Sequence, residues 1–191
     1  MKRETISYNT KKAMADALKK AMARRSLDSI TVTSIVEECN ITRSTFYYHF
    51  ADIYDLMIWM FEQEALVLLE KSRDADTWSD GLLEVYGYVE QNAAVCRCAL
   101  ESPGAGRDFL KRFFADSVYG FMMRFIDSLG IAAKKEHKLF IAKFYSEAIV
   151  SVLIDWLDDG MKQTPEEMIR LNEIAIKGAV SQALTNSLRM A

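Results

Sequence analysis

The sequence is poor in residues that break helices, cross-link chains or line membranes. Only two of its 191 residues are Pro and eight are Gly, so little would interrupt long helices. The three Cys are an odd number, which argues against a disulfide framework. No apolar run approaches the ~18 residues of a membrane span, and no apolar signal segment follows the start. We therefore expect a cytoplasmic protein without a membrane segment.

Residues suited to catalysis are also few. The chain contains two His, His49 and His137, and neither lies beside a Ser or Cys in a nucleophile motif. No Gly-rich phosphate loop is present. Cys96 and Cys98 form a Cys-x-Cys pair, but on a helix they point about 200° apart, and no third ligand is nearby. The sequence thus argues against an enzyme and predicts neither a cofactor nor a metal site.

Helical patterning runs through nearly the whole chain. Half of the residues are hydrophobic, which is enough for a substantial core, and no strand pattern is visible. We expect an all-α fold, with two short helices inside residues 31–50. The longer helices are expected over about residues 10–24, 52–73, 82–95, 107–129, 136–158 and 164–188.

The two last predicted helices carry a pattern typical of an interface between subunits. Ala175, Ala179 and Ala183 recur every four residues, and small residues at this spacing let a second helix approach closely. We expect this stripe to pair with the preceding helix in a four-helix bundle across a two-fold axis. The side chains of the preceding helix that should take part are Phe140, Phe144, Val152 and Trp156.

Residues 31–56, TVTSIVEECNITRSTFYYHFADIYDL, predict two short helices joined by a tight turn. Thr31 is expected to cap the first helix, with a Ser-x-x-Glu capping-box spacing that begins at Ser34. Asn40 occupies the point where the chain must leave this helix, and Asn tolerates the left-handed backbone that such an exit usually needs. Thr42 is expected to cap the second helix.

The second short helix has an aromatic inner edge and a polar outer edge. Phe46 and Phe50 are four residues apart and point inward together. On a wheel of about 100° per residue, the opposite side carries Ser44, Thr45 and Tyr48. Such an outer edge suits the major groove of DNA, so the pattern predicts a DNA-recognition helix.

Charge is distributed unevenly along the chain. Residues 1–50 contain nine Lys/Arg and five Asp/Glu, a formal charge of +4, whereas the whole chain carries −3. A basic end on an acidic body is expected when only that end meets phosphates. Solvation explains each early cation equally well, but four of them are candidates for backbone or minor-groove contact: Lys2, Arg3, Lys11 and Lys12.

These segments resemble the helix-turn-helix of TetR-family transcriptional regulators. The resemblance is carried by Thr31-Val32, Ile35-Val36, Asn40-Ile41 and the run Thr45-Phe46-Tyr47-Tyr48-His49-Phe50. It implies a homodimer that binds a palindromic operator in double-stranded DNA and responds to a small-molecule or protein effector. The downstream pattern is similar to the branch that includes regulators of dihydroxyacetone kinase operons.

The resemblance also implies roles for individual side chains. Tyr47 and His49 flank the outer edge and should bind phosphates, whereas Arg43 could contact either phosphates or bases. Thr33 and Ser34 open the first short helix, where free amide hydrogens favour a phosphate. The full set of predicted DNA-binding residues is Thr33, Ser34, Arg43, Ser44, Thr45, Tyr47, Tyr48 and His49.

The chain departs from the family pattern at three positions. Asn40 replaces the usual turn Gly, and Thr33 stands where a basic residue often opens the first short helix. Ile53 stands where the family commonly carries a Lys that can touch a phosphate. These departures keep open an alternative function, a helical protein–protein adaptor with weak or vestigial DNA binding.

We therefore expect two functional domains. Residues 1–51 should form an N-terminal three-helix, helix-turn-helix DNA-binding domain. Residues 52–191 should form a helical bundle for effector binding and dimerisation, since large, adaptable aromatic and Met side chains between Tyr86 and Trp156 suit a pocket.

Overall fold

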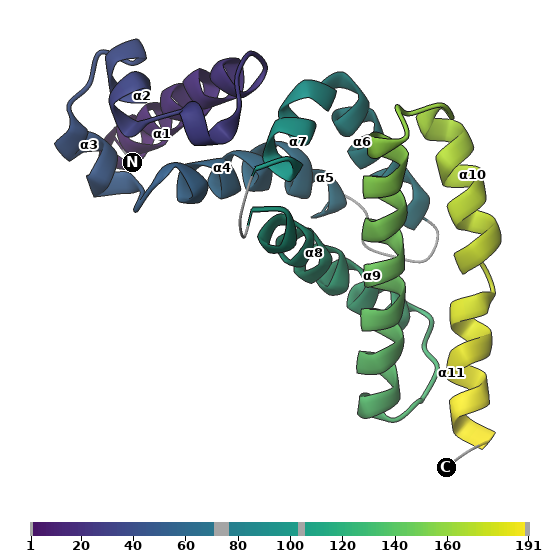
Figure 1. The fold of residues 1–191 in the computed structure, drawn as a ribbon. Helices are drawn as coiled ribbons and strands as arrows, with labels where there is room; N and C mark the ends of the chain where they lie inside the picture. Colours follow the sequence, from purple (N-terminus) through teal and green to yellow (C-terminus); the bar gives the residue numbers. More distant parts are fainter. Residues whose placement is uncertain (1, 71–76, 103–105, 190–191) are drawn as a thin grey trace. The chain divides into compact units, whose positions relative to one another are not determined.

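The computed structural model describes residues 2–70, 77–102 and 106–189, and every regular element in these ranges is helical. The predicted all-α fold is confirmed. The chain divides into two compact units, shown with their helices in Figure 1. The N-terminal unit comprises residues 1–64 and 92–107, and the C-terminal unit comprises residues 65–91 and 108–191.

The N-terminal unit is built around α1 (Lys2–Met22), which packs against α2 (Val32–Glu38), α4 (Ile53–Phe61) and α7 (Ala93–Leu100). The helix α3 (Arg43–His49) packs against α2. Residues 2–9 contain neither Pro nor Gly, so α1 begins earlier than the expected residue 10. The core of the unit includes Met14, Leu18, Ile35, Phe46, Leu56 and Met57.

The helix expected from residue 52 begins as predicted but changes its winding further along. The Asp52 carboxylate accepts a hydrogen bond from the Asp55 amide at 2.9 Å and thereby caps α4. Beyond α4 the helix widens into a π-helical turn over Glu62–Leu66 and continues as α5 (Val67–Glu70). Residues 71–73 of the expected helix lie outside the described ranges.

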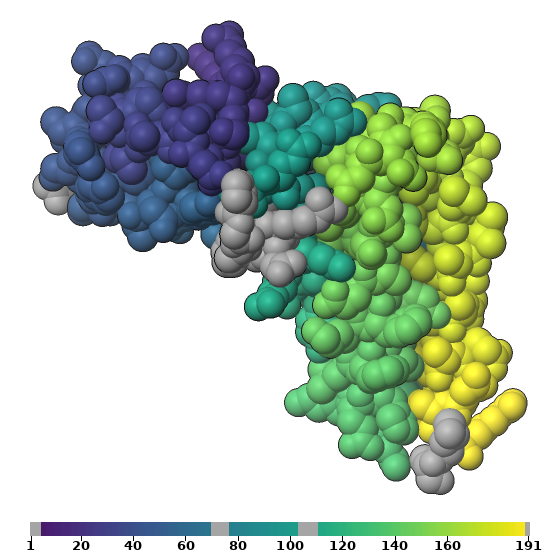
Figure 2. All heavy atoms as spheres, in the orientation of Figure 1, coloured from purple at the N-terminus to yellow at the C-terminus, as the bar shows by residue number. Residues whose placement is uncertain are grey.

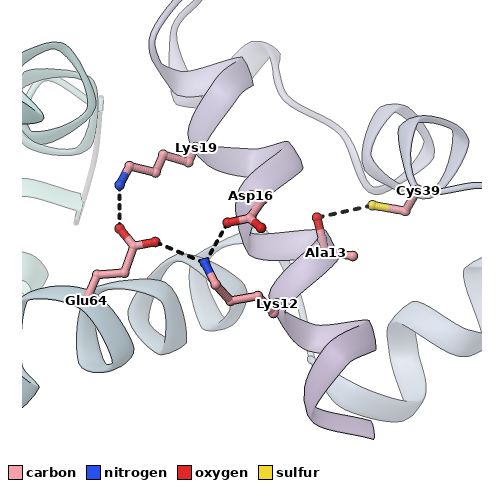
Figure 3. A network of polar contacts seen from close by, with 6 residues as sticks. All are labelled: Lys12, Ala13, Asp16, Lys19, Cys39 and Glu64. Carbon is pink, nitrogen blue, oxygen red and sulfur yellow. Dashed lines mark hydrogen bonds and ion pairs between the residues drawn. The ribbon is translucent and has the colours of Figure 1, made fainter. Parts of the chain in front are cut away.

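A carboxylate in the π-helical turn ties this turn to α1, as Figure 3 shows. Glu64 accepts a hydrogen bond from Lys19 Nζ at 2.5 Å and lies 3.6 Å from Lys12 Nζ. Lys12 also donates to Asp16 at 2.7 Å, and this bond raises the pKa of Lys12. Two carboxylates therefore hold the Lys12 ammonium on the protein, which weakens its candidacy for DNA contact.

The C-terminal unit consists of α5, α6 (Trp78–Gln91), most of α8 (Gly106–Ser128), α9 (Lys135–Asp158), α10 (Pro165–Ile176) and α11 (Ala179–Arg189). The helix α6 packs against α5, α9 and α10, and α11 packs against α9 and α10. Figure 2 shows the atoms of α9, in green, beside the yellow atoms of the two last helices. Many of the aromatic and Met side chains expected around a pocket instead fill the core: Tyr86, Phe121, Met122, Phe125 and Trp156.

A buried polar contact joins α6 to α10. Asn172 Nδ2 donates to the Tyr86 hydroxyl at 3.2 Å and to the Met168 carbonyl at 2.8 Å. Burial raises the pKa of Tyr86 to about 12. The Trp156 ring meets the Tyr86 ring edge-on, with centroids 5.1 Å apart, and its Nε1 donates to the Gln163 carbonyl. The prediction that Trp156 faces a second subunit is therefore wrong.

The last predicted helix begins as expected but is broken in the middle. Thr164 and Glu167 form a capping box at its start, with Pro165 in the first turn. The chain then leaves α10 at Gly178, whose φ of +82° lies in the left-handed region that favours Gly. Ala175 lies in α10, whereas Ala179 and Ala183 lie in α11, so the prediction of a stripe on one continuous helix is wrong.

The helix expected over residues 82–95 is also divided, and its second part belongs to the other unit. Asn92 separates α6 from α7, and α7 packs on α1. Ser102 then donates to Asp28 at 3.0 Å, and Cys98 Sγ lies 3.4 Å from the Arg25 carbonyl. The compact units thus do not follow the expected boundary after residue 51, and the division of functions at that residue stays a prediction.

None of the described helices combines the length and the apolar character that crossing a membrane requires.

The Tyr86–Asn172 bond predicts a coupled stability effect. Asn172→Ala should lower the free energy of unfolding by about 1–3 kcal/mol, because it leaves the buried Tyr86 hydroxyl without its donor. In a Tyr86→Phe background the same change should cost less, since the hydroxyl is already gone. Urea unfolding of the four proteins, followed by circular dichroism, measures the difference. Equal costs in both backgrounds would contradict the coupling.

Candidate DNA-binding surface

Local hydrogen bonds fix the two short helices and the turn between them. The Thr31 side chain accepts from the Ser34 amide at 3.2 Å, and the Ser34 hydroxyl accepts in return from the Thr31 amide. The capping box thus joins Thr31 to Ser34 and does not begin at Ser34, as its spacing had predicted. Asn40 has a φ of 52°, which confirms the left-handed turn. Thr42 caps α3 as predicted, accepting from the Thr45 amide at 3.1 Å.

The inner edge of α3 is anchored in the core. Phe46 is fully buried and Phe50 is 4% exposed, with ring centroids 6.0 Å apart. The Trp59 ring of α4 meets Phe50 with centroids 5.9 Å apart. This anchor fixes the rotation of α3 about its own axis and therefore determines which side chains face outward.

The outward face of α3 carries two large aromatic side chains in water. Tyr48 is 82% exposed and Tyr47 is 52% exposed, an unusual state for residues of this size. Arg43 and Ser44 are exposed beside them, and an Arg43 guanidinium nitrogen lies 3.5 Å from the Tyr47 hydroxyl. The structure thus brings four of the predicted DNA-binding side chains to one exposed helix face.

Thr45 differs from its neighbours on α3. It is only half-buried, and its hydroxyl lies 3.0 Å from the Thr42 hydroxyl that caps the helix. Wheel geometry cannot show this contact, because the contact depends on the side-chain rotamers of both residues. The Thr45 hydroxyl therefore has a partner within the protein and is less available to a base edge than that of Ser44.

His49 is half-buried at the end of α3, where its ring meets the Tyr48 ring with centroids 4.9 Å apart. Burial, and to a smaller extent the charge of Lys11, lowers the pKa of His49 below its ordinary value. Lys11 Nζ itself lies 5.5 Å from the centroid of the Trp59 ring. In the free protein His49 is therefore biased towards its neutral form.

Thr33 and Ser34 lie in the first turn of α2, but their side chains are placed differently. Thr33 is exposed, whereas the Ser34 hydroxyl donates to the Thr31 carbonyl and accepts from Arg25 Nη2, both at 2.9 Å. Arg25 is thus a cation at the start of α2 that the sequence did not single out. Only its position in the connection after the first helix could have drawn attention to Arg25. No local sequence pattern predicted its bond to Ser34.

The three Cys are free thiols and lie at least partly inside the protein. Cys39 and Cys98 are half-buried and Cys96 is buried, and burial raises the pKa of Cys96 to about 12. Among the described residues, no three His, Cys, Asp or Glu side chains gather where they could hold a metal ion. The side chains of Lys2 and Arg3, two further candidates for DNA contact, lie outside the described part of the chain.

Models of two protein families match the chain. The model described as bacterial regulatory proteins of the tetR family matches residues 15–58, which include α2 and α3. The model described as a transcriptional regulator C-terminal region matches residues 76–178. Together the two matches cover most of both units.

Individual relatives are also regulators. The chain is 32% identical over 86 residues to the dhaKLM operon transcriptional activator DhaS of Lactococcus lactis, a match that spans 45% of this chain and 46% of that protein. It is 24% identical over 156 residues to an HTH-type transcriptional regulator of Haemophilus influenzae, covering 75% of this chain and 74% of that one.

Two solved structures share the fold. The dihydroxyacetone kinase operon activator DhaS superposes with a TM-score of 0.65 at 21% identity and 95% coverage of both chains. NalD, described as the secondary repressor of the MexAB-OprM efflux pump of Pseudomonas aeruginosa, gives 0.62 at 14% identity, covering 93% of this chain and 98% of that one.

The lowered pKa of His49 predicts a pH dependence of DNA affinity. A phosphate beside the ring would raise this pKa, so binding would take up a proton. Affinity should therefore increase as the pH falls from about 8 through roughly 6.5, the ordinary value for His. His49→Gln should flatten this dependence, whereas Tyr47→Phe should leave it unchanged. Fluorescence anisotropy titrations at several pH values test this, and a flat wild-type profile would contradict a His49–phosphate contact.

Proposed function

This chain belongs to the TetR family of bacterial regulatory proteins, and we propose that it binds a palindromic operator as a homodimer under the control of an effector. Family membership makes it a DNA-binding transcriptional regulator. The observation that carries the proposal is the α3 face, where Tyr48 and Tyr47 stand exposed opposite the buried Phe46. We expect this regulator to act in the cytoplasm and to have no catalytic activity.

We assign the contacts by exposure and position. Ser44 and Tyr48 contact base edges in the major groove, with Thr45 in a supporting position. Tyr47 and His49 bind phosphates on either side, and Arg43 reaches a base or a phosphate from the start of α3. Thr33 adds a phosphate contact from α2, and Ser34 acts there through Arg25. The division into a DNA-binding domain at residues 1–51 and a regulatory domain at 52–191 is part of this proposal.

Exposed apolar side chains in the C-terminal unit support a homodimer. Phe140 and Phe144 of α9 are 72% and 61% exposed, and Ala148 and Val152 continue this stripe at intervals of four residues. On α10, Ile174 is 79% exposed. Exposed apolar side chains that gather in this way mark an interaction surface. A dimer also meets the requirement of a palindrome, whose half-sites lie about 34–36 Å apart.

The C-terminal unit is also the proposed place of effector control. An open groove of about 380 Å³ between α8 and α9 is lined by apolar and charged side chains, among them Tyr119, Phe140, Lys143 and Glu147. Such a mixture could orient a small molecule. The named relatives leave the sign of regulation open, since DhaS is an activator and NalD a repressor. If the effector is a protein, we expect it to bind the same unit, and its binding would require no small molecule.

Base and phosphate contacts predict different mutant behaviour. Tyr48→Ala should weaken operator binding by roughly 1–3 kcal/mol and relax sequence preference, because a base contact is lost. Tyr47→Phe should weaken operator and unrelated DNA alike, since it removes one hydroxyl that binds the backbone. Gel shifts with the chain's own upstream DNA and with a scrambled duplex make the comparison. Equal loss of specificity in both variants would show that α3 enters the groove in another rotation.

The dimer proposal predicts that a charge on the α9 stripe separates the subunits. Phe144→Arg should give a monomer that keeps its helical content, because an unpaired guanidinium would be buried at the interface. Gln91→Arg adds the same side chain at an exposed position of α6 and should remain dimeric. Size-exclusion chromatography with light scattering decides the matter. A monomeric wild type at micromolar concentration, or a dimeric Phe144→Arg variant, would overturn this interface.

A further inference from the structure

An open groove of about 410 Å³ lies between the end of α1 and α2. Its floor is made by small or apolar side chains, Ala17 and Ala21 of α1 and Ile35 of α2. Polar side chains complete the lining: Lys20, Arg24, Arg25, Ser34 and Glu38. The groove could not be predicted from the sequence, because its two walls meet only when α1 and α2 pack together.

The groove carries three cations and one carboxylate. Lys20, Arg24 and Arg25 are all exposed, and none of them forms an ion pair with a carboxylate anywhere in the described ranges. Lys12 and Lys19, on the same helix, are by contrast neutralised by Glu64. The groove at the end of α1 thus gathers three cations that no carboxylate holds.

The three cations are spaced for a linear anion. Lys20 lies in the last turn of α1, and Arg24 follows four residues later in the turn that ends this helix. One strand of duplex DNA offers a phosphate about every 3.4 Å along its axis, so long side chains with this spacing can meet separate phosphates of one strand. Arg25 is held at the end of the row by its bond to the Ser34 hydroxyl at 2.9 Å. A guanidinium has five donors, so this bond leaves several for a phosphate.

We propose that this groove is a second DNA-backbone site, in which Lys20, Arg24 and Arg25 bind phosphates that α3 does not reach. The inference rests on the proposed function, since it assigns a further surface to the same operator complex. DNA fits better than an acidic protein segment, because the row of cations ends at Ser34 in the first turn of α2. The neighbouring residue, Thr33, is already assigned a phosphate contact in the proposed function. The groove also offers basic side chains for phosphate contact, which this chain lacks at Ile53, where the family commonly carries a Lys.

The test uses the full-length chain and an operator selected by the wild type from a random duplex pool. Dissociation constants are measured over a salt series for the wild type, for Lys20→Gln/Arg24→Gln and for Lys162→Gln. The last variant removes one exposed cation of the C-terminal unit and serves as a control for a change in net charge. Both substituted positions are exposed, and Gln is a good helix former at Lys20, so we expect both variants to fold, which circular dichroism checks.

The slope of log affinity against log salt should become shallower by about 0.9 for each lost phosphate contact, or about 3.6 if both cations act in both subunits. The ratio of operator to scrambled-DNA affinity should stay unchanged, and Lys162→Gln should match the wild type. Phosphate-ethylation interference should lose its signal at discrete positions in the double variant alone.

Failure of the proposed function and failure of the groove assignment give different results. A wild type that selects no operator contradicts the proposed function itself. A wild type that selects an operator and shows a steep slope, with the same slope in the double variant, overturns only the groove. An equal change in Lys162→Gln overturns it too, because net charge would then explain the effect. A change in sequence preference would place these cations on bases and would also overturn the assignment.

Discussion

The burial of Phe46 is the interaction on which the candidate site depends. Its side chain is fully enclosed, and replacing such a residue with Ala typically costs about 3–5 kcal/mol. A helix of seven residues has little stability of its own, so packing rather than propensity holds α3 in place. The same contact sets the rotation of the helix and thereby turns the Tyr48 ring into water. The burial of one side chain therefore both stabilises α3 and orients its outer face.

The parts of the fold that depend on local bonds could be predicted from the sequence. Thr42 caps the helix that it was expected to cap, the helices capped by Asp52 and Thr164 begin where they were expected, and Asn40 takes its left-handed turn. Each of these features needs only neighbours within a few residues. The break at Gly178 was missed. A lone Gly in a helical pattern is tolerated in many helices, and only packing against other helices decides whether the chain turns there.

The same distinction applies to the candidate site. The inward direction of Phe46 and the outward direction of Tyr48 follow from helical periodicity alone. The Arg25–Ser34 bond and the Lys12–Glu64 pair could not be predicted, since their partners meet only after distant segments have packed. The early cations therefore looked equivalent in the sequence, whereas the structure separates those held by carboxylates from those left exposed.

The assignment of residues 92–107 to the N-terminal unit has a consequence for synthesis on the ribosome. Domains usually fold as they emerge, N-terminal parts first, at about 5–20 residues per second. Here α1 packs against α7, which is translated some seventy residues after α1 ends. The N-terminal unit therefore cannot complete its core until α7 has left the ribosomal exit tunnel. During synthesis, the α1 surface that α7 covers therefore stays without this partner for several seconds.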